Sequence, residues 1–279
     1  MQLGIKPSTF RLQPFSNGLP MFIDTHCHLD LPPLSSDLPQ ILRRAAAAGV
    51  VRFICPGVAP AGWQGIAATA AANPSISPAF GIHPLHICGC PDDSLAELEK
   101  YLPVAVAIGE TGLDYTDRDC DRLLQQDIFR RHLRLAGKYS LPIIIHCRRA
   151  FADLLRILAE ESARTGGVMH AFSGSVETAR ECIALGLKIG IAGPVTWSGA
   201  VKPVQVVRDI PLEHLLLETD SPDLTPQAYR GSRNEPAFLL AVAEKVAAIK
   251  GFTLEDVALA TTLNAQRIFH VKAASFFTQ

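Results

Sequence analysis

The sequence predicts an α/β protein that folds as a (β/α)8 TIM barrel. Eight short apolar segments alternate with longer helical patterns along the chain. Most of these segments are apolar on both faces, which is typical of parallel strands that are buried on both sides. A doubly wound open sheet is the alternative, but no glycine-rich phosphate loop follows the first strand. The pattern therefore favours the barrel.

The apolar segments define the strands of the predicted barrel. They are Phe22–Thr25, Arg52–Pro56, Ser77–Gly81, Ala105–Gly109, Pro142–Ile145, Gly167–Met169, Lys188–Ile191 and Leu215–Glu218. The predicted helices are Leu38–Ala48, a stretch from Asp119 or Asp121 to Tyr139, Phe151–Ser162, Val176–Leu185 and Glu235–Ile249. Asp37 is placed to cap the first helix, and Gly49, Gly186 and Gly251 stand where terminating glycines are expected. The long helix to Tyr139 is predicted to bury an apolar stripe of Leu124, Ile128, Leu133 and Leu135.

Composition indicates one large core. The chain has 279 residues, of which 48% are hydrophobic and 19% charged. We expect residues 21–279 to form a single barrel domain and residues 1–20 to be a loosely ordered extension. The formal net charge is −1, so a nucleic-acid partner would have to be held by a local basic patch or by metal.

Cysteine usage and hydropathy suggest a cellular compartment. The seven cysteines are odd in number and irregularly spaced, which predicts reduced thiols rather than a disulfide framework. Cys88 and Cys90 lack a matching second pair, so a loop is a simpler interpretation than a zinc site. No apolar run approaches the roughly 20 residues that span a bilayer, and prolines interrupt the first 20 residues. We expect a cytoplasmic monomer that does not contact membranes.

Polar residues accumulate where the predicted strands end. The first strand leads to His26 and His28, whose side chains leave the same face of an extended chain. Later strands end at His83, Glu110, His146, His170 and Asp220. Because barrel enzymes build their active sites from the carboxyl ends of the strands, we expect these residues to form one site.

Six of these residues are predicted metal ligands: His26, His28, Glu110, His146, His170 and Asp220. Singly, each has a simpler explanation, such as a hydrogen-bonded histidine, a salt bridge or a helix cap. Together they would be costly to bury unless a cation satisfied them. Six ligands exceed the three or four that one catalytic zinc takes, which favours two divalent cations sharing a bridging carboxylate. Imidazole ligands argue against Ca²⁺ and leave Zn, Mg or Mn open.

Several motifs around these residues resemble the TatD family of metal-dependent deoxyribonucleases, especially its bacterial branch of uncharacterised hydrolases. The resemblance runs in order from residue 22 to about residue 270. The motifs are Asp-Thr-His-Cys-His-Leu-Asp (24–30), Gly-Ile-His-Pro (81–84), Gly-Glu-Thr-Gly-Leu-Asp (109–114), Ile-His-Cys-Arg (145–148), His-Ala-Phe-Ser-Gly (170–174), Glu-Thr-Asp-Ser-Pro (218–222), Asn-Glu-Pro (234–236) and Asn-Ala-Gln-Arg-Ile-Phe (264–269).

The resemblance implies an amidohydrolase-like barrel with two metal positions. One ion would be held by His26, His28, Glu110 and Asp220. The other would be held by His146 and His170, with Glu110 bridging the two. It also implies hydrolysis of DNA phosphodiester bonds from 3′ ends, with single strands as the preferred form, although the family includes proteins assigned to other ester bonds.

These ligands lead to a predicted mechanism. Asp220 would orient the attacking water and accept its proton, Glu110 would bridge the ions, and the ions would neutralise charge on phosphate oxygens. His83 would donate to a phosphate oxygen or leaving group, or would support a ligand. Arg148, Arg230 and Arg233 are predicted to bind flanking phosphates. For Arg230 and Arg233, simple surface solvation is an equal alternative.

Three functions remain open from the sequence. They are a nuclease acting on DNA ends, a carboxyl-ester or amide hydrolase (for example on aminoacyl-tRNA or a lactone), and a binding protein that keeps its ligands without catalysis. The complete ligand set argues against the third. Stacking aromatics would favour the nuclease, and Phe172, Trp197 and Tyr229 lie in suitable loops, although packing would equally explain them.

Overall fold

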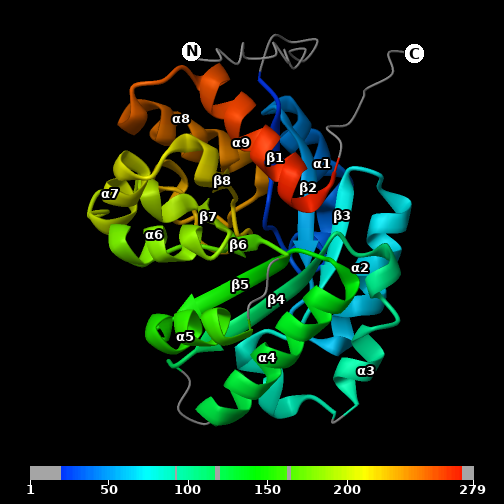
Figure 1. The fold of residues 1–279 in the computed structure, drawn as a ribbon. Helices are drawn as coiled ribbons and strands as arrows, with labels where there is room; N and C mark the ends of the chain where they lie inside the picture. The colour runs from blue at the N-terminus through cyan, green and yellow to red at the C-terminus, as the bar shows by residue number, and fades with distance from the viewer. Residues whose placement is uncertain (1–19, 92, 117–119, 162–164, 272–279) are drawn as a thin grey trace, which may run out of the picture.

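Eight parallel strands form one sheet in which each strand pairs with the next along the chain. The computed structural model describes residues 20–91, 93–116, 120–161 and 165–271, so nearly all of the predicted extension lies outside it. The strands are β1 (Phe22–Asp24), β2 (Val50–Pro56), β3 (Ile76–Phe80), β4 (Ala107–Asp114), β5 (Ile143–Arg148), β6 (Gly167–Met169), β7 (Leu187–Ile191) and β8 (Leu215–Leu217). Figure 1 shows the helices arranged around them.

Backbone hydrogen bonds draw the first and last strands together. Thr25 N donates to Leu217 O at 3.1 Å, and two further bonds join the segments that follow these strands. In those bonds Asp220 N donates to His26 O at 2.8 Å, and His28 N donates to Ser221 O at 2.9 Å. The predicted barrel is therefore confirmed, and the open doubly wound sheet is excluded.

Helices follow the strands in alternation. They are α1 (Leu38–Ala47), α2 (Pro60–Ala72), α3 (Ser94–Leu98), α4 (Arg122–Tyr139), α5 (Phe151–Glu161), α6 (Val176–Ala184), α7 (Lys202–Asp209), α8 (Leu239–Lys250) and α9 (Leu254–Phe269). Gly251 ends α8 with φ +69°, as its predicted stop position requires. Helix α8 begins later than predicted, because Pro236–Phe238 form a 3₁₀ turn. Helices α2, α3, α7 and α9 lie outside the predicted ranges. None of the helices in the described ranges has the length and apolar character needed to cross a bilayer.

The barrel interior is filled by apolar side chains at the end opposite the polar residues. Most strands contribute one residue to this cluster, and α9, which lies against β1 and β8, adds Ala265 and Phe269. The strand residues are Ile23, Ile54, Ala79, Ala107, Ile144, Val168 and Leu216. Because this apolar plug closes one mouth, a ligand has access from the other mouth.

The buried face of α4 differs from the predicted stripe. Leu133 is buried as expected, but Leu124 is 40% exposed, whereas Gln125 and His132 are fully buried. Gln125 accepts from Asp114 N and donates to Asp114 O, and His132 Nε2 accepts from Ile82 N. Polar side chains are tolerated there because they satisfy buried backbone groups, which helical periodicity does not reveal.

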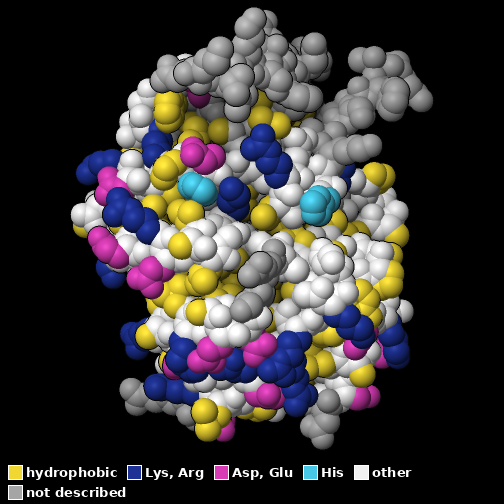
Figure 2. Space-filling model, viewed as in Figure 1, with side chains coloured by type: hydrophobic (Ala, Val, Ile, Leu, Met, Phe, Trp, Pro, Cys, Tyr) yellow, Lys and Arg dark blue, Asp and Glu magenta, His cyan; other side chains and the backbone are white. Residues whose placement is uncertain are grey.

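Charged side chains of α4 and α5 pair along the outside of the barrel. Arg130 and Arg134 both donate to Glu161, at 3.1 and 2.9 Å. Figure 2 shows basic and acidic side chains interspersed over these two helices. Such exposed pairs contribute about 0–1 kcal/mol each, so this surface is solvated rather than a patch of one sign.

The expectation that all thiols are reduced was wrong for one pair. Cys88 is bonded to Cys120 across a Cα–Cα distance of 6.0 Å. The bond joins the 3₁₀ turn Pro84–Gly89 to the residue before the N-cap of α4. The sequence does not show that these segments, 32 residues apart, meet in the fold. Cys90 is a free thiol, and Cys88 is not available as its partner in a metal site.

Candidate metal centre

The strand ends bring all six predicted ligands to one cavity or its floor. The cavity has a volume of about 590 Å³, and five of the six line it: His28, Glu110, His146, His170 and Asp220. The remaining ligand, His26, is fully buried directly beneath them. His83, Asp114 and Arg148 also line the cavity.

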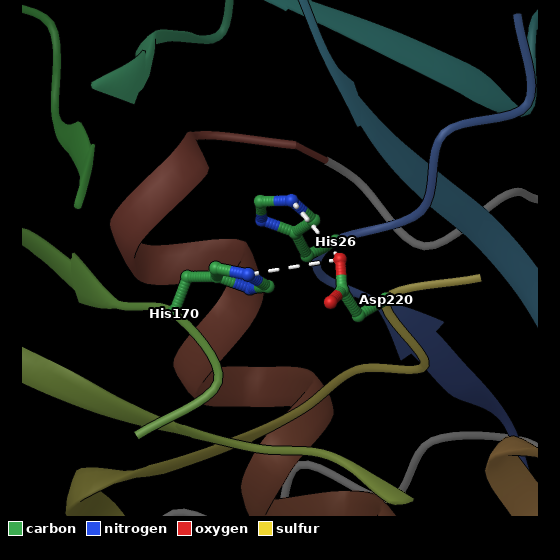
Figure 3. Close-up of side chains that lie close together, drawn as sticks. All are labelled: His26, His170 and Asp220. Atoms are coloured by element: carbon green, nitrogen blue, oxygen red, sulfur yellow. Dashed lines mark ion pairs between the residues drawn. The ribbon is translucent and has the colours of Figure 1, made fainter. Parts of the chain in front are cut away.

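The side chains that follow β1 and β8 lie close together, as predicted. Asp220 Oδ1 lies 3.7 Å from His26 Nε2 and 3.5 Å from His28 Nε2. His170 comes from the end of β6 and places its Nε2 3.6 Å from the same oxygen. Figure 3 shows the Asp220 carboxylate directed toward the two imidazoles of His26 and His170, whose rings are stacked with centroids 3.5 Å apart.

The two oxygens of Glu110 face different groups of histidines. Oε2 lies 3.2 Å from His26 Nε2 and 3.6 Å from His28 Nε2. Oε1 lies 3.1 Å from His146 Nδ1 and 3.7 Å from His170 Nε2. The carboxylate of Glu110 therefore stands between the two predicted groups of ligands.

Polar contacts on the far side of three imidazole rings favour a lone pair that faces the centre, whereas His26 Nδ1 is buried without a hydrogen-bond partner among the described residues. His28 Nδ1 faces the carbonyl oxygen of Pro56 at 3.2 Å, so this nitrogen carries the proton in the neutral ring. His170 Nδ1 lies 3.0 Å from the Glu218 carboxylate, and His146 Nε2 lies 3.0 Å from the Asp114 carboxylate. In each ring the other nitrogen is free to bind a cation. Carboxylate–histidine pairs of this kind orient histidine ligands in metal sites.

The electrostatics of the centre favour positive charge. Burial alone would lower the pKa of His28, but hydrogen bonding to Asp220 and the charge of Glu110 raise it to about 9. Burial alone would also lower the pKa of His170, but the charges of Asp220 and Glu218 outweigh this effect and raise it to about 10. Protons and metal ions compete for the same nitrogens, so the carboxylates that stabilise protonated imidazoles would also stabilise a bound divalent cation. The residues present thus fit a metal ion.

His83 differs from the other histidines of the cavity. Its Nδ1 accepts a hydrogen bond from Leu85 N at 3.1 Å, so the proton of the neutral ring resides on Nε2. Burial lowers the pKa of His83 to about 4, which keeps this ring neutral at physiological pH. With that proton, Nε2 is a hydrogen-bond donor 3.5 Å from Glu110 Oε1, although His83, Glu110 and His146 also lie close enough together to hold a metal ion. Its role as a donor to the substrate, or as support for a ligand, stays a prediction.

The sequence of the chain matches one known family over most of its length. Residues 23–270 match the family described as TatD related DNase. The chain belongs to the TatD family. A TatD relative from Bacillus subtilis, the uncharacterized metal-dependent hydrolase YabD, is 41% identical, and the match covers 90% of this chain and 100% of YabD. The predicted resemblance to TatD proteins is confirmed, together with the broader expectation of a metal-dependent hydrolase.

Solved structures agree with this assignment to the TatD family. The TatD homolog YJJV from Escherichia coli is 36% identical with a TM-score of 0.87, covering 90% of this chain and 98% of that one. An uncharacterized amidohydrolase from Saccharomyces cerevisiae shares the fold, with 19% identity and a TM-score of 0.74 over 89% of this chain and 99% of that one. The barrel fold that the resemblance implied is thus confirmed.

Three buried carboxylates around the candidate metal centre were not among the predicted site residues. Asp114 and Glu218 hold His146 and His170, respectively. Asp24 accepts from Thr219 Oγ1 at 2.6 Å and from Thr219 N at 3.0 Å, which ties the end of β1 to the end of β8. All three lie inside the motifs quoted above, but spacing alone does not separate a carboxylate that binds metal from one that orients a ligand.

Two glycines make room for these carboxylates. Gly112 adopts φ +141°, and a Cβ there would lie 2.0 Å from His146 O, so only glycine lets β4 approach β5 between Glu110 and Asp114. A Cβ at Gly190 would lie 2.6 Å from Glu218 Oε2. The positions of Asp114 and Glu218 therefore depend on residues that carry no chemistry themselves.

Removing the Asp114 carboxylate should weaken metal binding without unfolding the protein. In Asp114→Ala, His146 loses the acceptor that orients it, and we expect divalent-cation affinity to fall about 10–100-fold. Asp114→Asn keeps an acceptor oxygen and should lose less. Competition with a chelating dye measures both affinities, and circular dichroism checks the fold. Unchanged affinity in Asp114→Ala would show that the contact between Asp114 and His146 is incidental.

The buried His132 should make stability depend on pH. Burial lowers the pKa of His132 from 6.5 to about 4, although its hydrogen bond to Ile128 O opposes this. Between these values the unfolded chain takes up a proton that the folded protein excludes, so stability falls as pH decreases from 6.5 to 4. The shift corresponds to about 3 kcal/mol. His132→Gln, which retains a donor and an acceptor but does not titrate, should reduce the pH dependence by this amount.

Urea unfolding between pH 7 and 4, with chelator present in both proteins, measures the His132 contribution. Other histidines with lowered pKa values, such as His83, act equally in wild type and variant and therefore cancel. Parallel stability curves for the two proteins would refute the assignment.

The three arginines predicted to bind phosphate lie in different surroundings. Arg148 is exposed at the end of β5 and lines the cavity. Arg230 lies beyond it, with its guanidinium 4.6 Å from the centre of the Trp197 ring. Arg233 donates to Pro33 O at 3.1 Å and lies 3.9 Å from Glu235, so it braces the loop after β8. Trp197 also lines the cavity, whereas Phe172 is buried and Tyr229 stacks on Phe238.

Proposed function

We propose that this protein is a deoxyribonuclease that hydrolyses phosphodiester bonds at the 3′ ends of single-stranded DNA with two divalent cations. The family it belongs to is described as TatD related DNase, which supports DNA as the substrate. YabD is named only as a metal-dependent hydrolase, so the substrate and the number of ions are the new elements of the proposal.

The position of Glu110 carries the two-ion proposal. One carboxylate oxygen faces His26 and His28, and the other faces His146 and His170. A single ion would be bound by one group of imidazoles. Here each oxygen of the buried Glu110 carboxylate faces its own group, which favours two ions. Burial alone would raise the pKa of Glu110, but the charge of the neighbouring imidazoles holds it well below its usual range. Glu110 is thus ionised and suited to bridge two cations.

The chain supplies a proton acceptor and a proton donor around the proposed ions. When bound, divalent cations lower the pKa of water and stabilise negative charge on phosphate oxygens. Asp220 accepts the proton of the attacking water, because its carboxylate lines the cavity and remains ionised. Burial alone would raise the pKa of Asp220, but the charge of His170 and the hydrogen bond from His28 lower it. His83 Nε2–H donates to the departing oxygen or to a phosphate oxygen.

Arg148 completes the proposed recognition of phosphate. No ion pair or side-chain hydrogen bond within the described part of the chain engages its guanidinium, and it lines the same cavity as Glu110. An arginine there binds a phosphate through two parallel hydrogen bonds. The cavity volume of about 590 Å³ lies within the range of roughly 300–1,000 Å³ for small-ligand sites.

The test is a nuclease assay of purified protein on single-stranded DNA labelled at the 5′ end, with Zn²⁺, Mg²⁺ or Mn²⁺ added. We expect stepwise shortening from the 3′ end, and no shortening with chelator or with Glu110→Ala. The same preparations are offered a carboxyl ester and a lactone as alternative substrates. Hydrolysis of those esters without cleavage of DNA would overturn the proposed nuclease and favour the carboxyl-ester hydrolase.

A further inference from the structure

A second cavity adjoins the candidate metal centre. It has a volume of about 520 Å³ and lies between the loops after β7 and β8 and the start of α7. Three residues line both cavities: Ser173, Pro194 and Trp197. The second cavity therefore begins where the first ends, with the indole of Trp197 in the wall between them.

Hydrogen bonds between the two loops hold this wall in place. Trp197 Nε1 donates to Thr225 O at 2.9 Å, and Gln227 N donates to Thr196 Oγ1 at 2.8 Å. Ser198 N donates to the side chain of Gln227 at 3.2 Å. The Arg230 guanidinium lies over the Trp197 ring at 4.6 Å from its centre. The aromatic and the cation are thus arranged before any ligand arrives, which reduces the entropy lost on binding.

The lining of the second cavity is cationic and partly apolar. Lys202 and Arg230 are the charged residues among its described lining, and no acidic side chain contributes to it. Val201 beside them is 64% exposed. The metal-centre cavity, by contrast, contains the carboxylates of Glu110 and Asp220, which need cations of their own. A ligand that spans both cavities must offer negative charge in each and an apolar surface beside Trp197.

We infer that the second cavity is the subsite for the nucleotide on the 5′ side of the cleaved bond. This inference rests on the proposed function. A strand whose 3′ end lies at the metal centre continues in the 5′ direction, and the shared wall at Trp197 opens into the second cavity. Lys202 and Arg230 bind its phosphate, and its base contacts the Trp197–Arg230 stack and Val201. Stacking on aromatic and guanidinium groups together with backbone phosphate contacts is how proteins hold single strands without reading sequence.

The test compares DNA strands of two and six nucleotides with the metal-loaded enzyme at several salt concentrations. For wild type we expect kcat/KM to be at least about fivefold higher for the longer strand. A dinucleotide lacks the 5′ phosphate that Lys202 and Arg230 bind in the subsite, and a hydrogen bond to a charged group contributes that much or more. In Lys202→Ala and in Arg230→Ala this advantage should shrink. The slope of log kcat/KM against log salt for the longer strand should also become shallower in each variant, by at most about 0.7, which is the value for one phosphate contact on a single strand.

Arg208→Ala is the matched control, because Arg208 is exposed on the same helix α7 and does not line the cavity. It removes the same charge and should keep the length advantage and the salt slope of wild type. If wild type cleaves both strands and Lys202→Ala and Arg230→Ala behave like Arg208→Ala, the subsite is wrong and the proposed function stands. If wild type cleaves neither strand with any metal, the proposed function fails and the subsite fails with it.

Discussion

Glu110→Gln should abolish most activity while leaving the barrel folded. The substitution keeps the size of the side chain but removes the charge between the two groups of histidines. Breaking a buried charge pair costs about 3–5 kcal/mol, which corresponds to roughly 10²–10⁴-fold weaker metal binding. We expect less than two bound ions per chain and a fall in turnover of at least about the same size. Elemental analysis of the dialysed protein and initial rates on single-stranded DNA measure the two effects.

A matched carboxylate variant distinguishes the bridge from a general effect of lost charge. Glu161→Gln removes a charge that pairs with Arg130 and Arg134 between α4 and α5, away from the cavity. It should retain its metal content, and circular dichroism should be the same for both variants. A Glu110→Gln protein that retains two ions and full activity would show that Glu110 is not a bridging ligand.

Asp220→Asn should reduce turnover far more than metal binding. An amide oxygen can still coordinate a cation, so part of the metal affinity should remain. The amide cannot accept a proton at neutral pH, and general-base catalysis typically contributes about 10²–10⁴-fold. We therefore expect a rate loss in that range at saturating metal. Elemental analysis beside kcat, measured over a series of metal concentrations, separates the two contributions.

His83→Ala is the comparison for Asp220→Asn. Because His83 Nδ1 accepts from Leu85 N and its Nε2 carries the proton, this variant should keep its metal content. The loss should instead fall on the step that needs a donor to the substrate. Should Asp220→Asn lose rate only in proportion to lost metal, Asp220 is a ligand and the proton acceptor lies elsewhere. Loss of metal in His83→Ala would mean that His83 is itself a ligand.

The strand pattern and the ligands could be predicted because each is encoded locally. Strands buried on both faces are apolar along their whole length, so Gly167–Met169 was located at its observed bounds. A parallel barrel brings every strand end to the same mouth, so His26 and Asp220 could be paired across 194 positions of sequence once the order of strands was known. Boundaries were less certain: β4 extends five residues beyond its predicted end at Gly109, to Asp114.

Other features depend on contacts that have no local pattern. Asp114, Glu218 and His132 are polar residues whose roles follow from the groups they face across the fold. Periodicity treats His132 as a break in an apolar stripe, whereas the structure buries it because Ile82 N needs an acceptor. The bond between Cys88 and Cys120 and the different placements of Arg148, Arg230 and Arg233 have the same origin.

The sequence by itself determined the order of strands, the barrel and the six residues that meet at its mouth, because hydrophobic periodicity and strand-end position are properties of short segments. Only the tertiary structure decided which carboxylates orient the histidines and which oxygen of Glu110 faces each group. It also decided that a second, cationic cavity continues beyond Trp197. Those facts depend on distances between segments far apart in the chain, and such distances are set by the packing of the whole barrel.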